Sequence, residues 1–120
     1  MVKLVFCCRR RPELSREEFQ RIWLDQHGPL VRSLRAAIPA MRRYVQSHTL
    51  DTPANAAIRA SRGSAEAYDG ITEVWFDDLA ALGATSAEAA DAARRLLEDE
   101  ARFIDLARSS VFLTVEHEVF

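Results

Sequence analysis

Four short stretches have the alternating or β-branched composition that predicts β-strands. They comprise residues 2–8, 41–50, 70–77 and 111–120. In the second stretch, alternation places Tyr44, Gln46 and His48 on one face, with Met41 and Arg43 on the other. The first of these two faces is unusually polar and aromatic for a strand, which makes it a place to look for a binding site.

Two longer stretches repeat apolar residues at intervals of three and four, which predicts amphipathic helices. Ser15 and Glu18 have the spacing of a capping box, so we expect the first helix to begin there. Gly28 is expected to end it, and Pro29 suits the first turn of a second, short helix. The residues on the apolar side of the first helix are Phe19, Ile22, Trp23, Gln26 and His27.

A second capping box, Thr85 with Glu88, precedes a long helix, and residues 77–82 before it predict a short helical turn. The apolar side of the long helix comprises Ala89, Ala93, Leu96, Leu97, Glu100, Phe103, Ile104 and Ala107. Residues 51–69, in contrast, are rich in Ala, Ser and Gly and show no sustained period. We expect them to form a mobile loop over the mouth of a pocket, because loops of this length are usually functional or disordered.

The resulting order, βαββαβ, is that of the ferredoxin-like α+β fold, in which a four-stranded antiparallel sheet carries helices on one face. A chain of 120 residues without a linker or repeat is expected to form a single domain over residues 1–120. The other sheet face, with Val5, Trp75 and the final strand, is too apolar to remain in water. A second copy related by two-fold symmetry is the simplest cover, so we expect a homodimer.

Charge is distributed unevenly, although the net charge is only −2. Residues 1–62 hold 12 basic and 5 acidic residues, whereas residues 63–120 hold 4 basic and 13 acidic ones. The basic run at residues 9–11 has no interleaved aromatic residues, so we expect no nucleic-acid binding. No apolar run approaches the roughly 20 residues of a membrane span, and no signal peptide is recognisable. We therefore expect a cytoplasmic protein without a membrane partner.

Three side chains are candidates for taking part in a reaction. His27 ends the apolar side of the first helix, and its imidazole could transfer a proton near neutral pH. The Tyr44 hydroxyl could donate a hydrogen bond to a substrate oxyanion, and Glu100 must pair, become protonated or line a wet cavity. The structural alternatives are a histidine satisfied by backbone groups, a tyrosine with its hydroxyl in water, and a glutamate paired with Arg21 or Arg43.

The spacing of the histidines and the motifs of the chain favour neither a metal nor a nucleotide cofactor. No two histidines have a metal-ligand spacing, and the chain has no glycine-rich phosphate loop and no nucleophile-elbow motif. We therefore expect no cofactor and no metal site. Glu73 and Trp75 share one face of the third strand, where the sequence favours a pocket-lining role and an interface role equally.

Several motifs together resemble the EthD family over nearly the whole chain. The strongest is Trp23-x-x-x-His27-Gly28-Pro29, and Trp75-Phe76-Asp77 supports it, with further agreement at residues 43–46, 99–105 and 116–119. The resemblance implies a dimeric α+β barrel, in which two ferredoxin-like subunits pack their sheets together. It also implies a small-molecule pocket between the sheet and the helices of each subunit.

The resemblance also carries expectations about activity. Relatives in the family include a muconolactone methylisomerase, whose active site has a histidine matching His27 and a tyrosine matching Tyr44, and several members work without metal or flavin. That enzyme also has a cysteine on its third strand, which this chain lacks at residues 70–77. The isomerase reaction itself is therefore not carried over.

The expectation is a cofactor-independent enzyme that acts on an apolar, aromatic or lactone-like compound by isomerisation, dehydration, decarboxylation or direct monooxygenation. His27 is the expected proton-transfer residue, and Tyr44 is expected to orient the substrate or stabilise an oxyanion. The expected pocket residues are Phe19, Trp23, His48, Glu73, Trp75, Glu100 and Phe103. The alternatives are a ligand-binding or accessory protein without turnover and, less favoured, a haem protein with His27 or His48 as the axial ligand.

Overall fold

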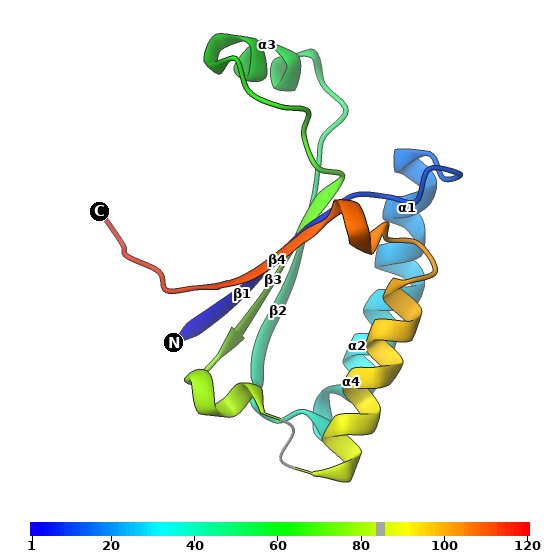
Figure 1. Ribbon diagram of the computed structural model, residues 1–120, viewed down its shortest axis with the longest axis vertical. Helices are drawn as coiled ribbons and strands as arrows, with labels where there is room; N and C mark the ends of the chain where they lie inside the picture. Colours follow the sequence, from blue (N-terminus) through cyan, green and yellow to red (C-terminus); the bar gives the residue numbers. More distant parts are fainter. Residues whose placement is uncertain (84–85) are drawn as a thin grey trace.

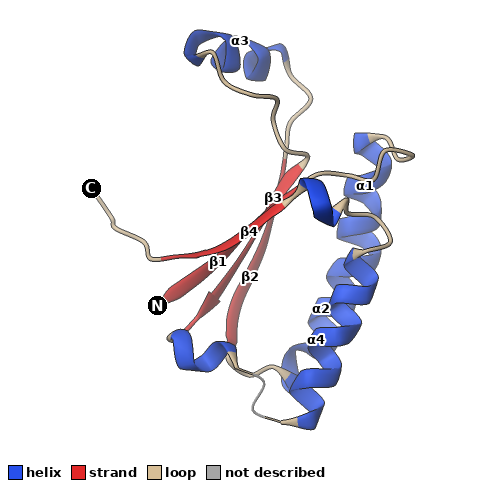
Figure 2. Cartoon of the chain, in the orientation of Figure 1, coloured by secondary structure: helices blue, strands red, loops and turns tan. Residues whose placement is uncertain are grey.

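Four antiparallel strands form a single sheet in the computed structural model, which describes residues 1–83 and 86–120 (Figure 2). The strands are β1 (Val2–Cys8), β2 (Met41–His48), β3 (Gly70–Phe76) and β4 (Ser110–Thr114). Their order in the sheet is β2-β3-β1-β4, so β1 and β3 are central and β2 and β4 are edges. This arrangement confirms the predicted ferredoxin-like α+β class.

Three helices lie along one face of the sheet (Figure 1). They are α1 (Arg16–Ile22), α2 (Gly28–Leu34) and α4 (Ala87–Glu100), with α4 packed beside α2. Short 3-10 turns occupy Arg35–Ala37, Leu79–Leu82 and Leu106–Arg108. The predicted capping box at Ser15 is confirmed, whereas the cap of α4 is Ser86, whose hydroxyl accepts from the backbone N–H of Ala89. Thr85, the predicted cap, lies outside the described residues.

The prediction that Gly28 ends the first helix is wrong. Gly28 is itself helical, with φ −53° and ψ −52°, and α1 continues through a π-helical turn at Trp23–His27 directly into α2. A regular α-helical turn would press the Pro29 ring against the carbonyl of Asp25. The wider turn, in which the Gly28 N–H donates to the Trp23 carbonyl, relieves that clash, and such turns are frequent at functional sites. The same turn leaves Gln26 exposed, against expectation.

An irregularity in β2 corrects the predicted division of its two faces. Met41 is opposite Phe76 and Arg43 is opposite Trp75, so Arg42 is the additional residue of a β-bulge. The bulge brings Met41 onto the helix-covered face, where it is buried, together with Tyr44. Arg43 lies over the Trp75 ring on the opposite face, at 4.7 Å from its centroid.

Residues 51–69 are not the irregular loop that we predicted, because they contain helix α3 (Pro53–Arg62). The Thr52 hydroxyl caps the helix at its start, and Gly63 ends it in the left-handed conformation, at φ 59°. The helix projects away from the other helices and from most of the sheet (Figure 1). Its apolar residues are small apart from Ile58, which is why periodicity did not indicate a helix there.

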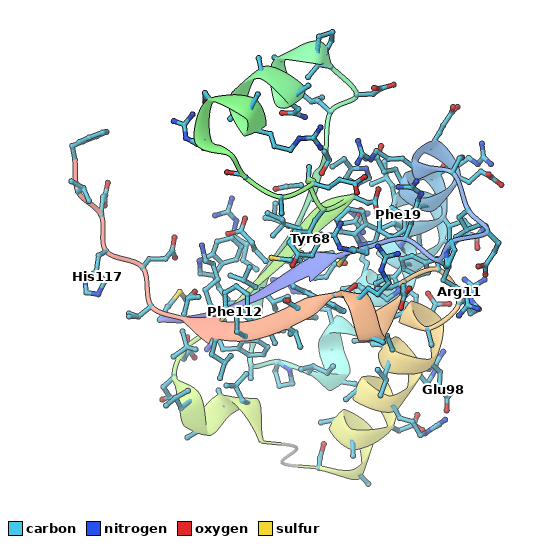
Figure 3. All side chains as sticks on the ribbon, turned by 45° about the horizontal axis from the view of Figure 1, so that its top comes forward. Arg11, Phe19, Tyr68, Glu98, Phe112 and His117 are labelled. Carbon is cyan, nitrogen blue, oxygen red and sulfur yellow. The ribbon has the colours of Figure 1, made fainter. Side chains whose placement is uncertain are left out.

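The final strand is shorter than predicted, since β4 ends at Thr114 and residues 115–120 extend without strand pairing. This C-terminal tail leaves the sheet, and His117 on it lies far from Phe19 in α1 (Figure 3). Leu97, predicted on the apolar side of α4, is 55% exposed, so the buried side of that helix is narrower than its sequence indicates.

Two clusters of buried side chains fill the space between the sheet and the helices. The first contains Cys8, Phe19, Trp23, Phe103 and Ile104, and the second contains Val31, Met41 and Val74. Tyr44 packs against the second cluster, and the His27 ring lies edge-on to Phe103 of the first at 5.3 Å. The predicted site residues therefore lie in the middle of the helix-covered face.

Within the described residues, no helix covers the opposite face of the sheet, here called the open face (Figure 2). Strand alternation places Val5, Ile71, Trp75 and Phe112 on it. Lys3 and Glu73 form an ion pair there at 2.7 Å.

No helix in the described part of the chain is both long and apolar enough to cross a membrane.

Candidate active site

The π-helical turn buries His27 and aims it at the C-terminal end of α4. The ring is 3% exposed, and its Nδ1 lies 2.8 Å from Oδ2 of Asp99. Arg102 donates from Nε to the other carboxylate oxygen of Asp99 at 2.8 Å, which fixes the carboxylate in place. An ionised Asp99 accepts the proton of Nδ1, so Nε2 keeps its lone pair and can act as a base.

The surroundings of His27 favour the neutral imidazole. Burial lowers the pKa of His27, and the hydrogen bond to Asp99 only partly opposes this effect. Burial acts to raise the pKa of Asp99, but hydrogen bonds from His27 and Arg102 outweigh it, so this carboxyl stays below its ordinary value. At neutral pH the pair is therefore a neutral histidine held by a carboxylate, the arrangement typical of an oriented general base.

Glu100 lies on the other side of the His27 ring, with Oε2 at 4.0 Å from Nε2. That distance exceeds a direct hydrogen bond. Burial, together with the charge of Asp99, raises the pKa of Glu100 to about 7. Neither Arg21 nor Arg43 pairs with it among the ion pairs of the described residues, so that predicted alternative is wrong. Glu100 is thus a carboxyl group that can hold or release a proton near neutral pH.

Tyr44 projects from β2 into the same interior, beside a set of polar side chains. Gln46 donates from Nε2 to the Tyr44 hydroxyl at 3.4 Å and to the Trp23 carbonyl at 3.0 Å. Burial raises the pKa of Tyr44, and the charge of Glu100 adds to this effect, whereas contacts with Gln46, Trp23 and Thr72 oppose it. The hydroxyl is thus a protonated donor that lies within electrostatic reach of Glu100.

A flat aromatic stack closes one side of this interior. The Trp23 indole lies against the His48 ring, with centroids 4.6 Å apart and planes inclined by 19°. His48 is held by its Nε2, which lies 2.9 Å from Oε1 of Gln46. A Cβ at Gly70 would lie 2.3 Å from the indole, so only glycine allows the backbone of β3 to approach Trp23 this closely.

An open cleft of about 920 Å³ runs between α2 and the edge strand β2. Its size suits a small organic ligand. Tyr44, Gln46 and His48 line it from the strand, whereas Leu24, Pro29 and Val31 line it from the helical side. His27 and Glu100 are not among its lining residues, and of the predicted site residues Tyr44 and His48 line it.

The structure brings together some of the predicted site residues and separates others. Trp23, His27, Tyr44, His48 and Glu100 all belong to the helix-covered face. Phe19 and Phe103 lie there too, and these two, like Trp23, are fully buried in the first core cluster and do not line the cleft. Glu73 and Trp75 lie on the open face, where Trp75 donates from Nε1 to Glu116 at 2.6 Å. They share no pocket with His27, and this placement favours the interface role over the pocket role.

Sequence reasoning missed the groups that hold the site in place. Asp99 and Gln46 were not candidates, although each orients a predicted residue. Asp69 was also missed, and it is almost fully buried between Arg10 and Arg16, at 2.6 and 2.9 Å. A signal for Asp99 was available, because an acidic residue beside Glu100 near the end of α4 is unfavourable for the helix dipole unless a cation or donor compensates.

The arrangement can therefore hold a basic imidazole nitrogen and a protonatable carboxyl 4.0 Å apart, so that a proton passes between them only through a bridging water or ligand atom, and it can present a hydroxyl donor to a ligand. Within residues 1–83 and 86–120, no three His, Cys, Asp or Glu side chains are placed to hold a metal ion. The absence of metal and cofactor stays a prediction, which elemental analysis and the absorbance spectrum of the purified protein would check.

Comparison with known proteins places these motifs in a family. The model of the EthD domain matches residues 11–107. No curated protein sequence matches the chain significantly.

Several solved structures are similar to this chain in fold. An EthD family protein from Bacillus halodurans C-125 has a TM-score of 0.62 at 19% identity, over 98% of this chain and 99% of that one. A dimeric ferredoxin-like protein of unknown function from Thermobifida fusca YX has a TM-score of 0.60 at 16% identity, over 96% and 90%. A dimeric protein of ferredoxin-like fold from Bacteroides fragilis NCTC 9343 gives 0.60 at 15% identity, over 96% and 95%. At these identities the likeness concerns the fold alone.

Proposed function

The chain belongs to the EthD family, and from that premise we propose that it is a cofactor-independent enzyme acting on a small apolar, aromatic or lactone-like compound. His27 is the proton-transfer residue in this proposal. The chemistry is isomerisation, dehydration, decarboxylation or monooxygenation in which a deprotonated substrate reacts directly with oxygen. All four begin with, or depend on, a proton moved at a defined atom.

The observation that carries the proposal is the Asp99–His27–Glu100 group. Asp99 holds Nδ1 of His27 at 2.8 Å, and Nε2 faces a carboxyl whose pKa is about 7. Asp99 already fixes the orientation and the tautomer of the ring, so a merely structural role for His27 leaves the neighbouring carboxyl of Glu100 unexplained. Burying the carboxyl of Glu100 costs free energy. That cost is explained if Glu100 accepts or returns the proton that His27 takes up.

In this proposal the substrate lies in the cleft between α2 and β2, and Tyr44 donates a hydrogen bond to one of its oxygens. Burial keeps Tyr44 protonated, so its hydroxyl can stabilise negative charge that develops on that oxygen. His48, which lines the cleft and stacks on the buried Trp23 indole, offers an aromatic wall. His27 then reaches the ligand past Tyr44 once the ligand has displaced or reordered the side chains between them.

We further propose that the protein is a homodimer whose two open faces pack together. The apolar residues on the open face support this association, as do the two similar structures described as dimeric. Lys3, Glu73, Trp75 and Glu116 would then lie at or near the interface.

A ligand screen with two variants tests the enzymatic proposal. Aromatic and lactone compounds that raise the melting temperature are incubated with the protein, and mass spectrometry reports any chemical change. His27→Asn keeps a side-chain N–H toward Asp99 and removes the basic nitrogen. It should lower turnover by roughly 10²-fold while the melting temperature changes little. His117→Asn, on the exposed tail, is the matched control and should leave turnover unchanged.

A binding protein without turnover is the second candidate function. The observation that favours it is the absence of His27 and Glu100 from the lining of the cleft. Ligands that bind the parent protein saturably and are recovered unchanged would replace the enzyme with this candidate. If His27→Asn unfolds the protein and no compound is ever converted, His27 is a structural residue.

A further inference from the structure

The cleft between α2 and β2 is lined by basic residues without an acidic counterpart. Its lining includes Arg32, Arg35, Arg42 and Arg43 and no aspartate or glutamate. An excess of one charge in a concave, partly apolar site favours a ligand of the opposite charge. This asymmetry is a property of the cleft itself and does not depend on the chemistry at His27.

Two of these arginines are already engaged. Arg42 makes a bidentate ion pair with Asp77, with its Nη2 at 2.7 Å and its Nε at 3.1 Å from Oδ2. Arg43 lies over the Trp75 ring on the open face. Neither guanidinium needs a ligand in order to be satisfied.

Arg32 and Arg35 differ from this pair. They are three residues apart at the end of α2, so their side chains leave the helix on one side. Among the described residues no carboxylate forms an ion pair with either, and both remain exposed. Two free guanidinium groups side by side are suited to an anion with two oxygens, which arginine binds in a planar, bidentate manner.

The rest of the lining indicates the body of the ligand. Leu24, Pro29, Val31 and Met41 give the cleft apolar walls. Tyr44 and Gln46, on the strand opposite α2, can fix one further polar group. We propose that the cleft binds a small organic monocarboxylate with an apolar or aromatic body, whose carboxylate is held by Arg32 and Arg35. This inference rests on the proposed function only in taking this cleft as its ligand site.

The test uses equilibrium binding of 2-naphthoate, measured by calorimetry on the parent protein. Its neutral partner, 2-naphthamide, has the same ring system and should bind at least tenfold more weakly. Raising NaCl from 50 to 500 mM should weaken 2-naphthoate and leave 2-naphthamide unchanged, since salt screens an exposed charge pair. 2-Naphthyl phosphate distinguishes a carboxylate site from a phosphate site.

A matched pair of variants locates the anion site. Arg32→Gln with Arg35→Gln should weaken 2-naphthoate at least tenfold and 2-naphthamide less than twofold. The control, Arg59→Gln with Arg62→Gln, makes the same charge change at the same spacing on α3. Those two arginines line a second hollow that also contains Asp51 and Glu66, so their loss should change 2-naphthoate affinity less than twofold.

Three results would overturn the proposal: equal affinities for 2-naphthoate and 2-naphthamide, no saturable binding of 2-naphthoate, or equal weakening by the control variant. Tighter binding of 2-naphthyl phosphate would overturn the carboxylate assignment. The two proposals fail separately, because this test measures equilibrium binding of 2-naphthoate and needs no turnover, whereas the enzymatic proposal is tested by turnover of a screened compound.

Discussion

The two faces of the sheet differ in how their charged side chains are paired. On the open face, each charged group of β1 and β3 has a close partner, since Lys3 pairs with Glu73 at 2.7 Å and Trp75 donates to Glu116. On the helix-covered face, no lysine or arginine among the described residues forms an ion pair with Glu100, and burial raises its pKa to about 7. Closed ion pairs suit a surface that another subunit covers, whereas an unpaired buried acid suits chemistry.

Strand alternation is the cause of this separation. Thr72 and Val74 on β3 face the helices, and Glu73 and Trp75 between them face the other way. A residue of β3 therefore contributes to one role or to the other. The two roles should accordingly respond to different mutations, and the predictions below use that independence.

The largest expected effect is on assembly. Ile71→Asp places a charge on the central strand β3 near one end of the open face, opposite Cys7 and Ser47. An uncompensated charge buried in an interface costs about 3–5 kcal/mol, so the dimer dissociation constant should rise by roughly 10²-fold or more. Sedimentation velocity at micromolar concentration should then show a species near 13.5 kDa.

Leu97→Asp, on the exposed side of α4, is the control and should leave the dimer intact. A monomeric parent protein would show instead that the open face does not associate.

The second effect concerns stability and the helix-covered face. The pKa of Glu100 is raised from 4.5 to about 7 in the folded state, so between these values the folded protein binds more protons than the unfolded chain. Its stability therefore falls as the pH rises through this window. Glu100→Gln removes the ionisation, and above pH 7 it should be more stable than the parent by about 3 kcal/mol. Below pH 4.5 the two should be similar.

Urea unfolding from pH 4 to pH 8, at one protein concentration, measures this difference. Glu98→Gln, two residues away on the exposed side of α4, provides the control. A constant difference between Glu100→Gln and the parent at every pH would show that Glu100 has an ordinary pKa.

A smaller effect is expected at Tyr44. Tyr44→Phe keeps the ring packed on the second core cluster and removes only the hydroxyl, so the fold should remain and a substrate found by the screen should still bind. Turnover should fall by roughly tenfold, less than for His27→Asn, because one hydrogen bond to developing charge is lost. Tyr68→Phe, outside the cleft, serves as the comparison. Unchanged turnover in Tyr44→Phe would remove the oxyanion role.

The sequence predicted the parts of this molecule that depend on local periodicity. Strand alternation and helix stripes gave the α+β class, and a carboxylate on an apolar stripe singled out Glu100. The π-helical turn and the bulge at Arg42 were not predicted, because each is a one-residue change in geometry that no period reveals. The pairing of His27 with Asp99 depends on how the π-helical turn and α4 lie together, and this arrangement comes from packing rather than from either segment alone.

The smallest effect tests whether the ion pair of the open face is covered. A double-mutant cycle with Lys3→Gln and Glu73→Gln measures the coupling free energy of the pair. Exposed pairs contribute about 0.2–1 kcal/mol and weaken in salt, whereas a pair covered by a second subunit is screened less. The coupling should therefore exceed 1 kcal/mol in the dimer, fall below about 1 kcal/mol in the Ile71→Asp background, and become salt-sensitive only there. Equal coupling in both backgrounds would place Lys3 and Glu73 outside the interface, even if Ile71 lies within it.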